Sequence, residues 1–377
     1  MNDQDLHAHL IGRQGSRRDL NTPVLVVEED ALQRNIARMA EFAASKGVKL
    51  RPHAKTHKSA DIAKLQIAAG AVGLCCAKLG EAEALADGGV LKGLHITSPV
   101  VSAPAIARLA QLNLRVEDMM SVVDHPDNAH ALGVAAAAAG KPLKVLIDID
   151  PGIRRTGVAS AEAAVALFHA IQAEPGLTYM GVQFYCGAQQ HIEDFAARKA
   201  AAEDRAAYLR ACIAALTEAG GAPQIVSGSG TGTHRIDAEF GLFTEFQVGS
   251  YVFMDSQYLA CAEIGPYETS LFIDARVVSA NAPGMVTVDA GFKAFSTDAD
   301  KPVILGGAPE GSKYFFMGDE HGAVVLPPGA DQPALSDMVT LAAPHCDPTV
   351  NLYDTYHVVR DGTLTALWPV SGRGRSR

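Results

Sequence analysis

Short apolar runs alternate with amphipathic stretches over the first two thirds of the chain. The stretch 30–45 places Leu32, Ile36 and Met39 at helical spacing, and 160–173 repeats the pattern. Between such stretches, eight apolar runs predict β-strands: 49–52, 73–76, 93–97, 121–124, 143–148, 179–184, 224–227 and 245–248. Eight strand and helix units predict an α/β fold, a (β/α)8 TIM-type barrel whose active site lies at the C-terminal ends of the strands.

After residue 260 the pattern changes to β structure. Alternating or apolar runs at 270–279, 285–289, 323–326, 338–342 and 356–368 are separated by Gly and Pro turn signals. These runs predict a C-terminal antiparallel β domain. The strand-like run 22–27 either joins this domain or leads into the barrel. We therefore expect a barrel over residues 28–260 and a β domain built from 1–27 and 261–377.

Composition narrows the class of protein. The 377 residues are 48% hydrophobic, enough to bury a large core, and the formal net charge of −10 argues against a nucleic-acid partner. No apolar run is long enough to span a bilayer, and residues 1–5, MNDQD, lack the features of a signal peptide. We expect a cytoplasmic enzyme with no membrane contact, whose six cysteines are reduced thiols.

One lysine stands out chemically. Residues 52–58, PHAKTHK, follow the first predicted strand and place Lys55 between two histidines and close to further cations. Such neighbours lower the pKa of an amine and make it a nucleophile toward carbonyls, which indicates a Schiff-base lysine. A basic turn on a solvated surface is the alternative. Lys49 and Lys58 are rival amines, and we expect Lys58 to be a solvated or phosphate-pairing cation.

Two distant segments add to this hypothesis. Residues 227–233, SGSGTGT, follow a predicted strand, and a loop this rich in glycine and hydroxyl groups can surround a phosphate. Near the C-terminus, His345 and Asp347 are two residues apart, which places both side chains on one side of an extended segment and suits a metal ion. Cys346 would then point to the other side.

Together these segments resemble D-threonine aldolase, in order along the chain from about residue 22 to the C-terminus. The wider group is the fold-type III pyridoxal-phosphate enzymes, which includes D-serine dehydratase, 3-hydroxy-D-aspartate aldolase and alanine racemase. The resemblance rests on RPHAKTHK at 51–58, CC at 75–76, GVQFYCG at 181–187, SGSGTG at 227–232, QVGSYVFMD at 247–255, DAGFK at 289–293, DEHG at 319–322 and HCDPT at 345–349.

The resemblance implies a role for each candidate residue. Lys55 would hold pyridoxal 5′-phosphate, Arg155 and Tyr185 would flank its ring, and His191 would contact the substrate and act as a base, unless a metal-bound hydroxide does so. Arg154, next to Arg155, leaves open a slipped alignment. His345 and Asp347 would bind a divalent ion, with Mn²⁺ favoured and Mg²⁺, Co²⁺ or Zn²⁺ as alternatives. The phosphate would be held by Gly230, Thr231, Gly232, Gly249, Ser250 and Tyr251.

The implied activity is cleavage of D-threonine and other small D-3-hydroxy amino acids to glycine and an aldehyde, by a homodimer. Related dehydratases have Cys, not Asp, two residues after the histidine, which favours the aldolase. A D-serine or D-3-hydroxyaspartate dehydratase, and a pyridoxal-phosphate racemase, are the alternatives on the same fold. A cofactor carrier without catalytic activity would consist of the barrel alone, and the residues after 260 argue against it.

Overall fold

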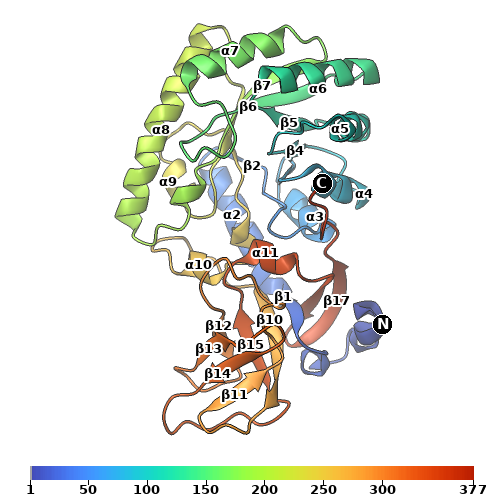
Figure 1. Ribbon diagram of the computed structural model, residues 1–377, viewed down its shortest axis with the longest axis vertical. Helices are drawn as coiled ribbons and strands as arrows, with labels where there is room; N and C mark the ends of the chain where they lie inside the picture. Colours follow the sequence, from blue (N-terminus) through green and yellow to red (C-terminus); the bar gives the residue numbers. More distant parts are fainter. Residues whose placement is uncertain (1) are drawn as a thin grey trace.

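A computed structural model describes residues 2–377 as a barrel and an antiparallel sheet (Figure 1). The parallel sheet has the order β2-β9-β8-β7-β6-β5-β4-β3, and a parallel bridge between His53 and Cys75 closes it. All eight predicted barrel strands are confirmed. They are β2 (Lys49–Leu50), β3 (Leu74–Cys76), β4 (Leu94–Ile96), β5 (Met120–Val123), β6 (Leu143–Asp148), β7 (Leu177–Phe184), β8 (Ile225–Gly228) and β9 (Glu245–Phe246).

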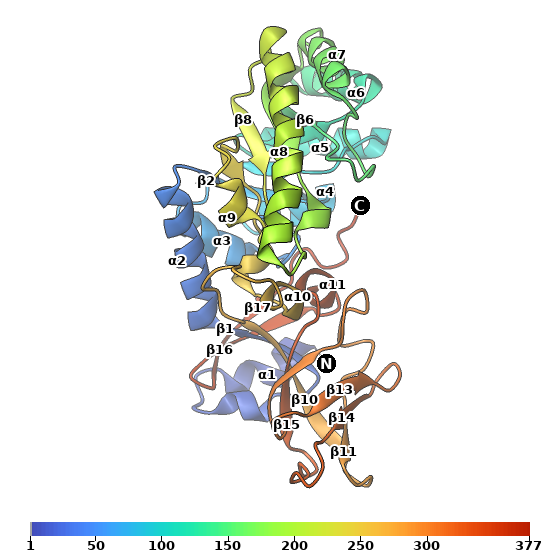
Figure 2. The same ribbon diagram turned by 90° about the vertical axis from the view of Figure 1, so that its left-hand side faces the viewer.

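Helices cover the outside of the barrel, as Figures 1 and 2 show. Local sequence sets several of their ends: Pro126 begins α6, and Gly140 ends it with φ of 79°, a conformation that favours glycine. The helices are α2 (Glu29–Ser45), α3 (Ala60–Ala68), α4 (Leu79–Asp87), α5 (Ala103–Arg115), α6 (Pro126–Ala139), α7 (Ala161–Gln172) and α8 (Phe195–Glu218), with the short α9 (His234–Asp237) and α10 (Ser256–Leu259) after β8 and β9. Among residues 2–377, no helix is long and apolar enough to cross a membrane.

The second sheet is mostly antiparallel and draws strands from both ends of the chain. The segment at 22–27 enters it as β1 (Val24–Glu28), which pairs antiparallel with β10 (Leu271–Ser279) and parallel with β16 (Thr355–Arg360). The other strands are β11 (Met285–Val288), β12 (Val303–Gly306), β13 (Lys313–Phe316), β14 (Gly322–Val325), β15 (Met338–Ala342) and β17 (Thr363–Pro369). β12 and β13 were not predicted from the sequence.

The segment at 345–347 differs from the prediction. It was expected to be extended, but only His345 is, and α11 (Cys346–Val350) begins at the next residue. This helix lies at the junction of the two sheets (Figure 1). One apolar core runs across that junction, because Phe246 at the end of the barrel strand β9 belongs to the same buried cluster as Leu25 and Ile273 of the antiparallel sheet. The two sheets therefore share a core.

At the opposite end of the barrel, a buried ion pair joins neighbouring strands. The guanidinium of Arg51 donates twice to the Glu245 carboxylate, with Nε to Oε2 at 2.8 Å and Nη2 to Oε1 at 2.9 Å. Its Nη1 donates to the Gly93 carbonyl. Because all these groups are buried, the pairing satisfies charges that would be costly if left alone. The segment 52–58, which contains Lys55, begins directly after Arg51.

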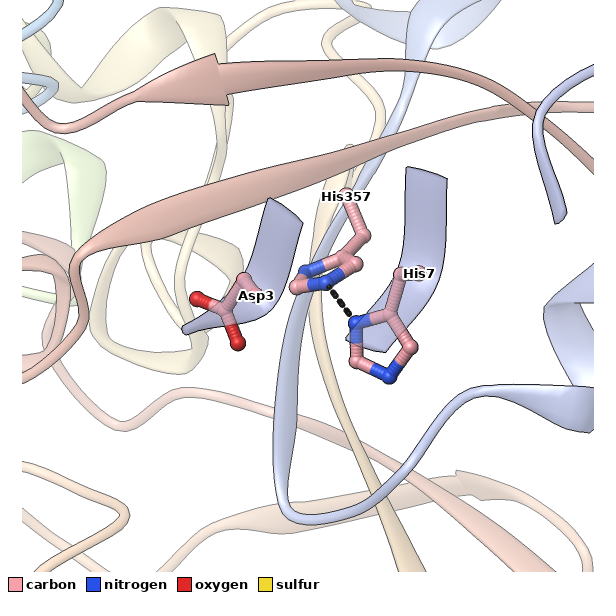
Figure 3. A group of neighbouring side chains, drawn as sticks. All are labelled: Asp3, His7 and His357. Carbon is pink, nitrogen blue, oxygen red and sulfur yellow. Dashed lines mark hydrogen bonds between the residues drawn. The ribbon is translucent and has the colours of Figure 1, made fainter. Parts of the chain in front are cut away.

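The N-terminal segment is tied to the antiparallel sheet by two buried histidines (Figure 3). The Asn21 backbone N–H donates to Nε2 of His7 at 3.0 Å, so the ring proton of neutral His7 is on Nδ1. That proton is donated to Nε2 of His357, 2.7 Å away, and Nδ1 of His357 donates to the Leu25 carbonyl at 3.2 Å. Asp3 lies beside the pair. The three side chains resemble a metal site. However, the two histidine nitrogens that face each other are joined by the hydrogen bond described above, so neither is free to bind an ion.

We expect this histidine pair to make the fold sensitive to acid. Burial lowers the pKa of His7 and of His357 below the usual value. The unfolded chain then binds protons first, so stability is complete above about pH 6.5 and is lost as the pH falls toward the folded-state pKa. His357→Gln should reduce the loss of unfolding free energy between about pH 7 and pH 5 by on the order of 1–2 kcal/mol, measured by denaturant unfolding.

His321→Gln is the matched control, because His321 is exposed on the antiparallel sheet. It should keep the full pH dependence of the wild type. Equal pH dependence in the wild type and His357→Gln would show that the buried pair does not contribute to acid sensitivity.

Candidate active site

The loops at the C-terminal ends of the barrel strands surround a cavity of 520 Å³. Lys55 follows β2, Arg155 follows β6 and Tyr185 follows β7, and all three line this cavity. The cavity therefore brings together three residues that are far apart in the sequence. Its other polar lining residues include His53, Lys78, Thr97, Asp124, Thr156, Gln183 and Gln247.

Lys55 forms an ion pair with Asp347, which connects the barrel to helix α11 at the junction of the two sheets. Its Nζ lies 2.8 Å from Oδ2 of Asp347, which is in the first turn of α11. The charge of Asp347 is the main reason why the pKa of Lys55 is raised, and it outweighs the burial that would lower it. The prediction that neighbouring cations lower the pKa of Lys55 is therefore wrong for the protein without its cofactor.

The reason lies in the neighbours of Lys55. Burial lowers the pKa of His53 well below its usual value and that of His57 to about 4, so both imidazoles are neutral and add no positive charge. Lys58 is neither solvated nor free to pair with a phosphate, because its ammonium forms a buried ion pair with Glu81. The residues that form a cationic cluster in the sequence therefore add no unpaired positive charge next to Lys55 in the fold.

Residues near the C-terminal end of the chain also hold the lysine loop in place. The Tyr356 hydroxyl donates to the His57 carbonyl at 2.7 Å, and the Gly372 N–H donates to the Lys58 carbonyl at 2.8 Å. Lys58 itself has φ of 48°. A non-glycine residue in this left-handed region persists only where its surroundings enforce it. The ion pair of Lys58 with Glu81 supplies that enforcement.

Arg155 lies on a loop that carboxylates fix in place. Its guanidinium carbon is 5.7 Å from the centre of the Tyr185 ring. Oδ2 of Asp148 accepts a hydrogen bond from the Thr156 hydroxyl at 2.8 Å, and Asp124 accepts one from the Gly157 N–H at 3.0 Å. The neighbouring Arg154 does not line the cavity in the part of the chain that the structure describes. Arg155 is thus the arginine placed to meet a ligand.

Two loops, 229–233 after β8 and 249–251 after β9, lie against each other. The Tyr251 N–H donates to the Thr231 hydroxyl at 3.0 Å, and the Gly232 N–H donates to Oε1 of Gln190 at 2.9 Å. A Cβ atom at Gly232 would lie 1.9 Å from the backbone carbonyl oxygen of Gln190. Only glycine fits at this approach.

The second loop also passes close to the lysine loop. A Cβ atom at Gly249 would lie 2.6 Å from Oγ1 of Thr56, a buried hydroxyl with no hydrogen-bond partner. The close approach of the glycine backbone at Gly249, next to Ser250, to a residue of the facing loop that is one position from Lys55 suits the phosphate of a cofactor held by that lysine. The side chain of Tyr251 points elsewhere, because its hydroxyl accepts a hydrogen bond from Gln66 at 3.0 Å in the core. The residues present fit pyridoxal phosphate.

His345 and Asp347 form the second part of the site. Oδ1 of Asp347 is buried and has no hydrogen-bond partner, while Oδ2 is held by Lys55. Burial alone would raise the pKa of Asp347, but the nearby Lys55 and His345 lower it well below its usual range. The carboxylate is therefore ionised and has a free oxygen, which suits a divalent cation.

The backbone between these two residues is fixed by an aspartate that sequence reasoning assigned no role. Asp255 accepts hydrogen bonds from the Cys346 N–H at 2.9 Å and from the Tyr258 N–H at 3.1 Å, so one side chain caps both α11 and α10. The Cys346 thiol is buried. Asp255 belongs to the motif at 247–255, but its partner is far along the chain, and nothing local could have indicated the contact.

In the part of the chain that the structure describes, His191 is not among the residues that line the cavity around Lys55. It follows β7, and its ring is 4.5 Å from that of Tyr258, measured between centres. Partial desolvation, followed by the charges of His345 and Lys55, lowers the pKa of His191, although the residue is exposed. It lines a second cavity of 520 Å³ together with Ser256 and Lys301. His191 is thus a neutral imidazole within electrostatic reach of the lysine and of both candidate metal ligands.

A barrel with a lysine at the end of its first strand, joined to a β domain at the mouth, defines the fold-type III pyridoxal-phosphate enzymes. Residues 27–257 match the family described as alanine racemase, N-terminal domain, and 270–359 match a putative serine dehydratase domain. Within this class, the chain belongs to the D-threonine aldolase family of aldehyde-lyases.

The similarity to individual proteins supports this assignment. A 3-hydroxy-D-aspartate aldolase of Paracoccus denitrificans (strain Pd 1222) is 39% identical over 365 residues, covering 95% of this chain and 93% of the relative. A D-threonine aldolase of Arthrobacter sp. is 38% identical over 360 residues, covering 95% and 94%. The crystal structure of D-threonine aldolase from Filomicrobium marinum superposes with a TM-score of 0.90 at 38% identity, covering 95% and 97%.

The geometry predicts which amine binds the cofactor. Borohydride reduction of the cofactor-loaded protein should fix a pyridoxyl group on Lys55, located by peptide mass spectrometry, because the Lys58 amine is buried against Glu81. Lys55→Ala should lose both the fixed group and activity. Lys49→Ala, which removes the exposed rival amine, should keep both. A pyridoxyl group found on Lys58 would contradict the assignment.

Proposed function

We propose that this protein cleaves the Cα–Cβ bond of D-threonine and other D-3-hydroxy amino acids, giving glycine and an aldehyde, with pyridoxal phosphate and a divalent cation. The observation that supports this most directly is the unpaired Oδ1 of Asp347 beside the lysine, with His345 close by. An oxygen ligand there suits a cation that binds a substrate hydroxyl. The names of the relatives at 38–39% identity point to the same reaction.

Each side chain has a defined part in this proposal. Lys55 would hold the cofactor, the loops with Gly230, Thr231, Gly232, Gly249 and Ser250 would bind its phosphate, and Arg155 and Tyr185 would flank the ring. Bound there, pyridoxal phosphate supplies the electron sink that allows a bond to Cα to break. His191, whose pKa is lowered, would accept the proton of the substrate's β-hydroxyl, unless a metal-bound hydroxide does so.

The metal-binding residues separate the aldolase from the dehydratase proposal. A D-threo-3-hydroxyaspartate dehydratase, 28% identical with a TM-score of 0.81, has been solved in a metal-free form as a variant in which a cysteine is replaced by alanine. Here the thiol of Cys346 is buried, and Asp347 has the free ligand atom. A histidine and carboxylate pair favours a hard or borderline ion, Mn²⁺ before Mg²⁺, Co²⁺ or Zn²⁺. We also propose that the protein is a cytoplasmic homodimer.

Product analysis tests the reaction. With D-threonine, cofactor and Mn²⁺, we expect glycine and acetaldehyde in equal amounts, and no turnover of L-threonine. The aldehyde is measured by coupled reduction and glycine by chromatography. Ammonia and a 2-keto acid as the main products would support the dehydratase instead.

We expect that the metal can be removed without loss of the cofactor. Lys55 and the phosphate loops are on the barrel, whereas His345 directly precedes α11 and Asp347 is in its first turn. A chelator should abolish activity but leave the pyridoxyl group that borohydride fixes on Lys55. Asp347→Ala should weaken Mn²⁺ binding by more than about 100-fold, since loss of even an outer partner typically costs 10- to 100-fold.

Cys346→Ala is the control for this experiment, because its buried thiol lies on the same turn and, among the described residues, no recorded hydrogen bond joins it to His345 or Asp347. It should remain active and metal-dependent. Loss of metal dependence in Cys346→Ala, with Asp347→Ala unaffected, would mean that the ligand pair is wrong.

A further inference from the structure

We propose that Asp298 is a positioning residue that orients His345 and determines which of its nitrogens binds the metal. The proposal rests on the function proposed above, in which His345 is a metal ligand. Oδ2 of Asp298 lies 2.8 Å from Nδ1 of His345. An ionised carboxylate only accepts hydrogen bonds, so Nδ1 of His345 must carry the ring proton.

The position of this proton determines what His345 can do. With the proton on Nδ1, the lone pair is on Nε2, and the ring can bind a cation only through that atom. Histidines that bind metals usually donate their other N–H to a carboxylate or a carbonyl, which fixes the ring and makes it a stronger ligand. Asp298 and His345 have this arrangement, and the free Oδ1 of Asp347 supplies the next ligand along the chain.

The segment before Asp298 is fastened to the metal-binding segment by further contacts. The Ser296 N–H donates to the Thr349 hydroxyl at 3.0 Å, and that hydroxyl donates to the His345 carbonyl at 2.7 Å. The Ser296 hydroxyl also donates to this carbonyl, at 3.2 Å. Because these contacts do not involve the Asp298 side chain, the fold itself holds the two segments together and keeps the carboxylate of Asp298 next to the imidazole. Changing the carboxylate alone should leave the segments in place.

Asp298 is suited to a clean test because it is exposed. Its side chain is 56% exposed, and its interaction with His345 is the one that the structure records for it among residues 2–377. Removing it should therefore have little effect on folding. Asp300 is a matched control, because it has the same charge, lies two residues further along the same segment, and lines the neighbouring cavity with His191.

The experiment measures Mn²⁺ affinity in the cofactor-loaded protein by the electron paramagnetic resonance signal of free Mn²⁺. Asp298→Ala should weaken binding by about 10- to 100-fold. Asp298→Asn, which keeps an oxygen acceptor for Nδ1–H, should recover part of this loss. Asp300→Asn should bind Mn²⁺ like the wild type, and borohydride should still fix the pyridoxyl group on Lys55 in all three variants.

Asp347→Ala, measured in the same way, separates the existence of the metal site from the role of Asp298. If it loses Mn²⁺ binding while Asp298→Ala binds like the wild type, the role of Asp298 is refuted and the metal site stands. If Asp300→Asn weakens binding as much as Asp298→Ala, general negative charge explains the effect and the proposal is also refuted. If Asp347→Ala binds Mn²⁺ normally, the metal site itself is wrong, and the role of Asp298 is refuted with it.

Discussion

The ion pair between Lys55 and Asp347 is the interaction on which the architecture of the site depends. One partner follows the first strand of the barrel, and the other is in a short helix at the junction with the antiparallel sheet. Neither half of the molecule contains both the lysine and the proposed metal-binding pair. The shared apolar core and the capping of α11 by Asp255 hold the lysine and Asp347 at a 2.8 Å separation. Packing outside the cavity thus determines which groups meet within it.

The barrel could be predicted because its strands have an unambiguous pattern. Parallel strands covered on both faces appear as short apolar runs, and helices with one buried face separate them. β12 (Val-Ile-Leu-Gly) and β13 (Lys-Tyr-Phe-Phe) are apolar runs of only four residues that the prediction missed, and in the fold exposed residues such as Val303 and Lys313 alternate with more buried ones at the edge of the second sheet. The helix α11 could not be predicted either. Its five residues include a proline and two β-branched residues, and tertiary contacts stabilise it.

For the site, residue types were easier to predict than their states. Loops that follow barrel strands meet at one end, so the positions of Lys55, Arg155 and Tyr185 around one cavity follow from the order of the strands. Protonation depends on partners that the sequence does not bring together. His53 and His57 are neutral because they are buried, and the charge of Lys58 is paired with Glu81 on helix α4. The contact of Asp298 with His345 likewise exists only in the folded chain.

The pairing of β1 has a consequence for the synthesis of the chain. β1 is made before any barrel strand, yet its parallel neighbour β16 is made after all of them. Until then, the apolar run Val-Leu-Val-Val of β1 has an open edge on that side, and such edges pair readily with other chains. The barrel and the antiparallel sheet share an apolar core, so this core cannot be completed before β16 is in place. Nascent chains are therefore open to mispairing at β1 until β16 has left the ribosome.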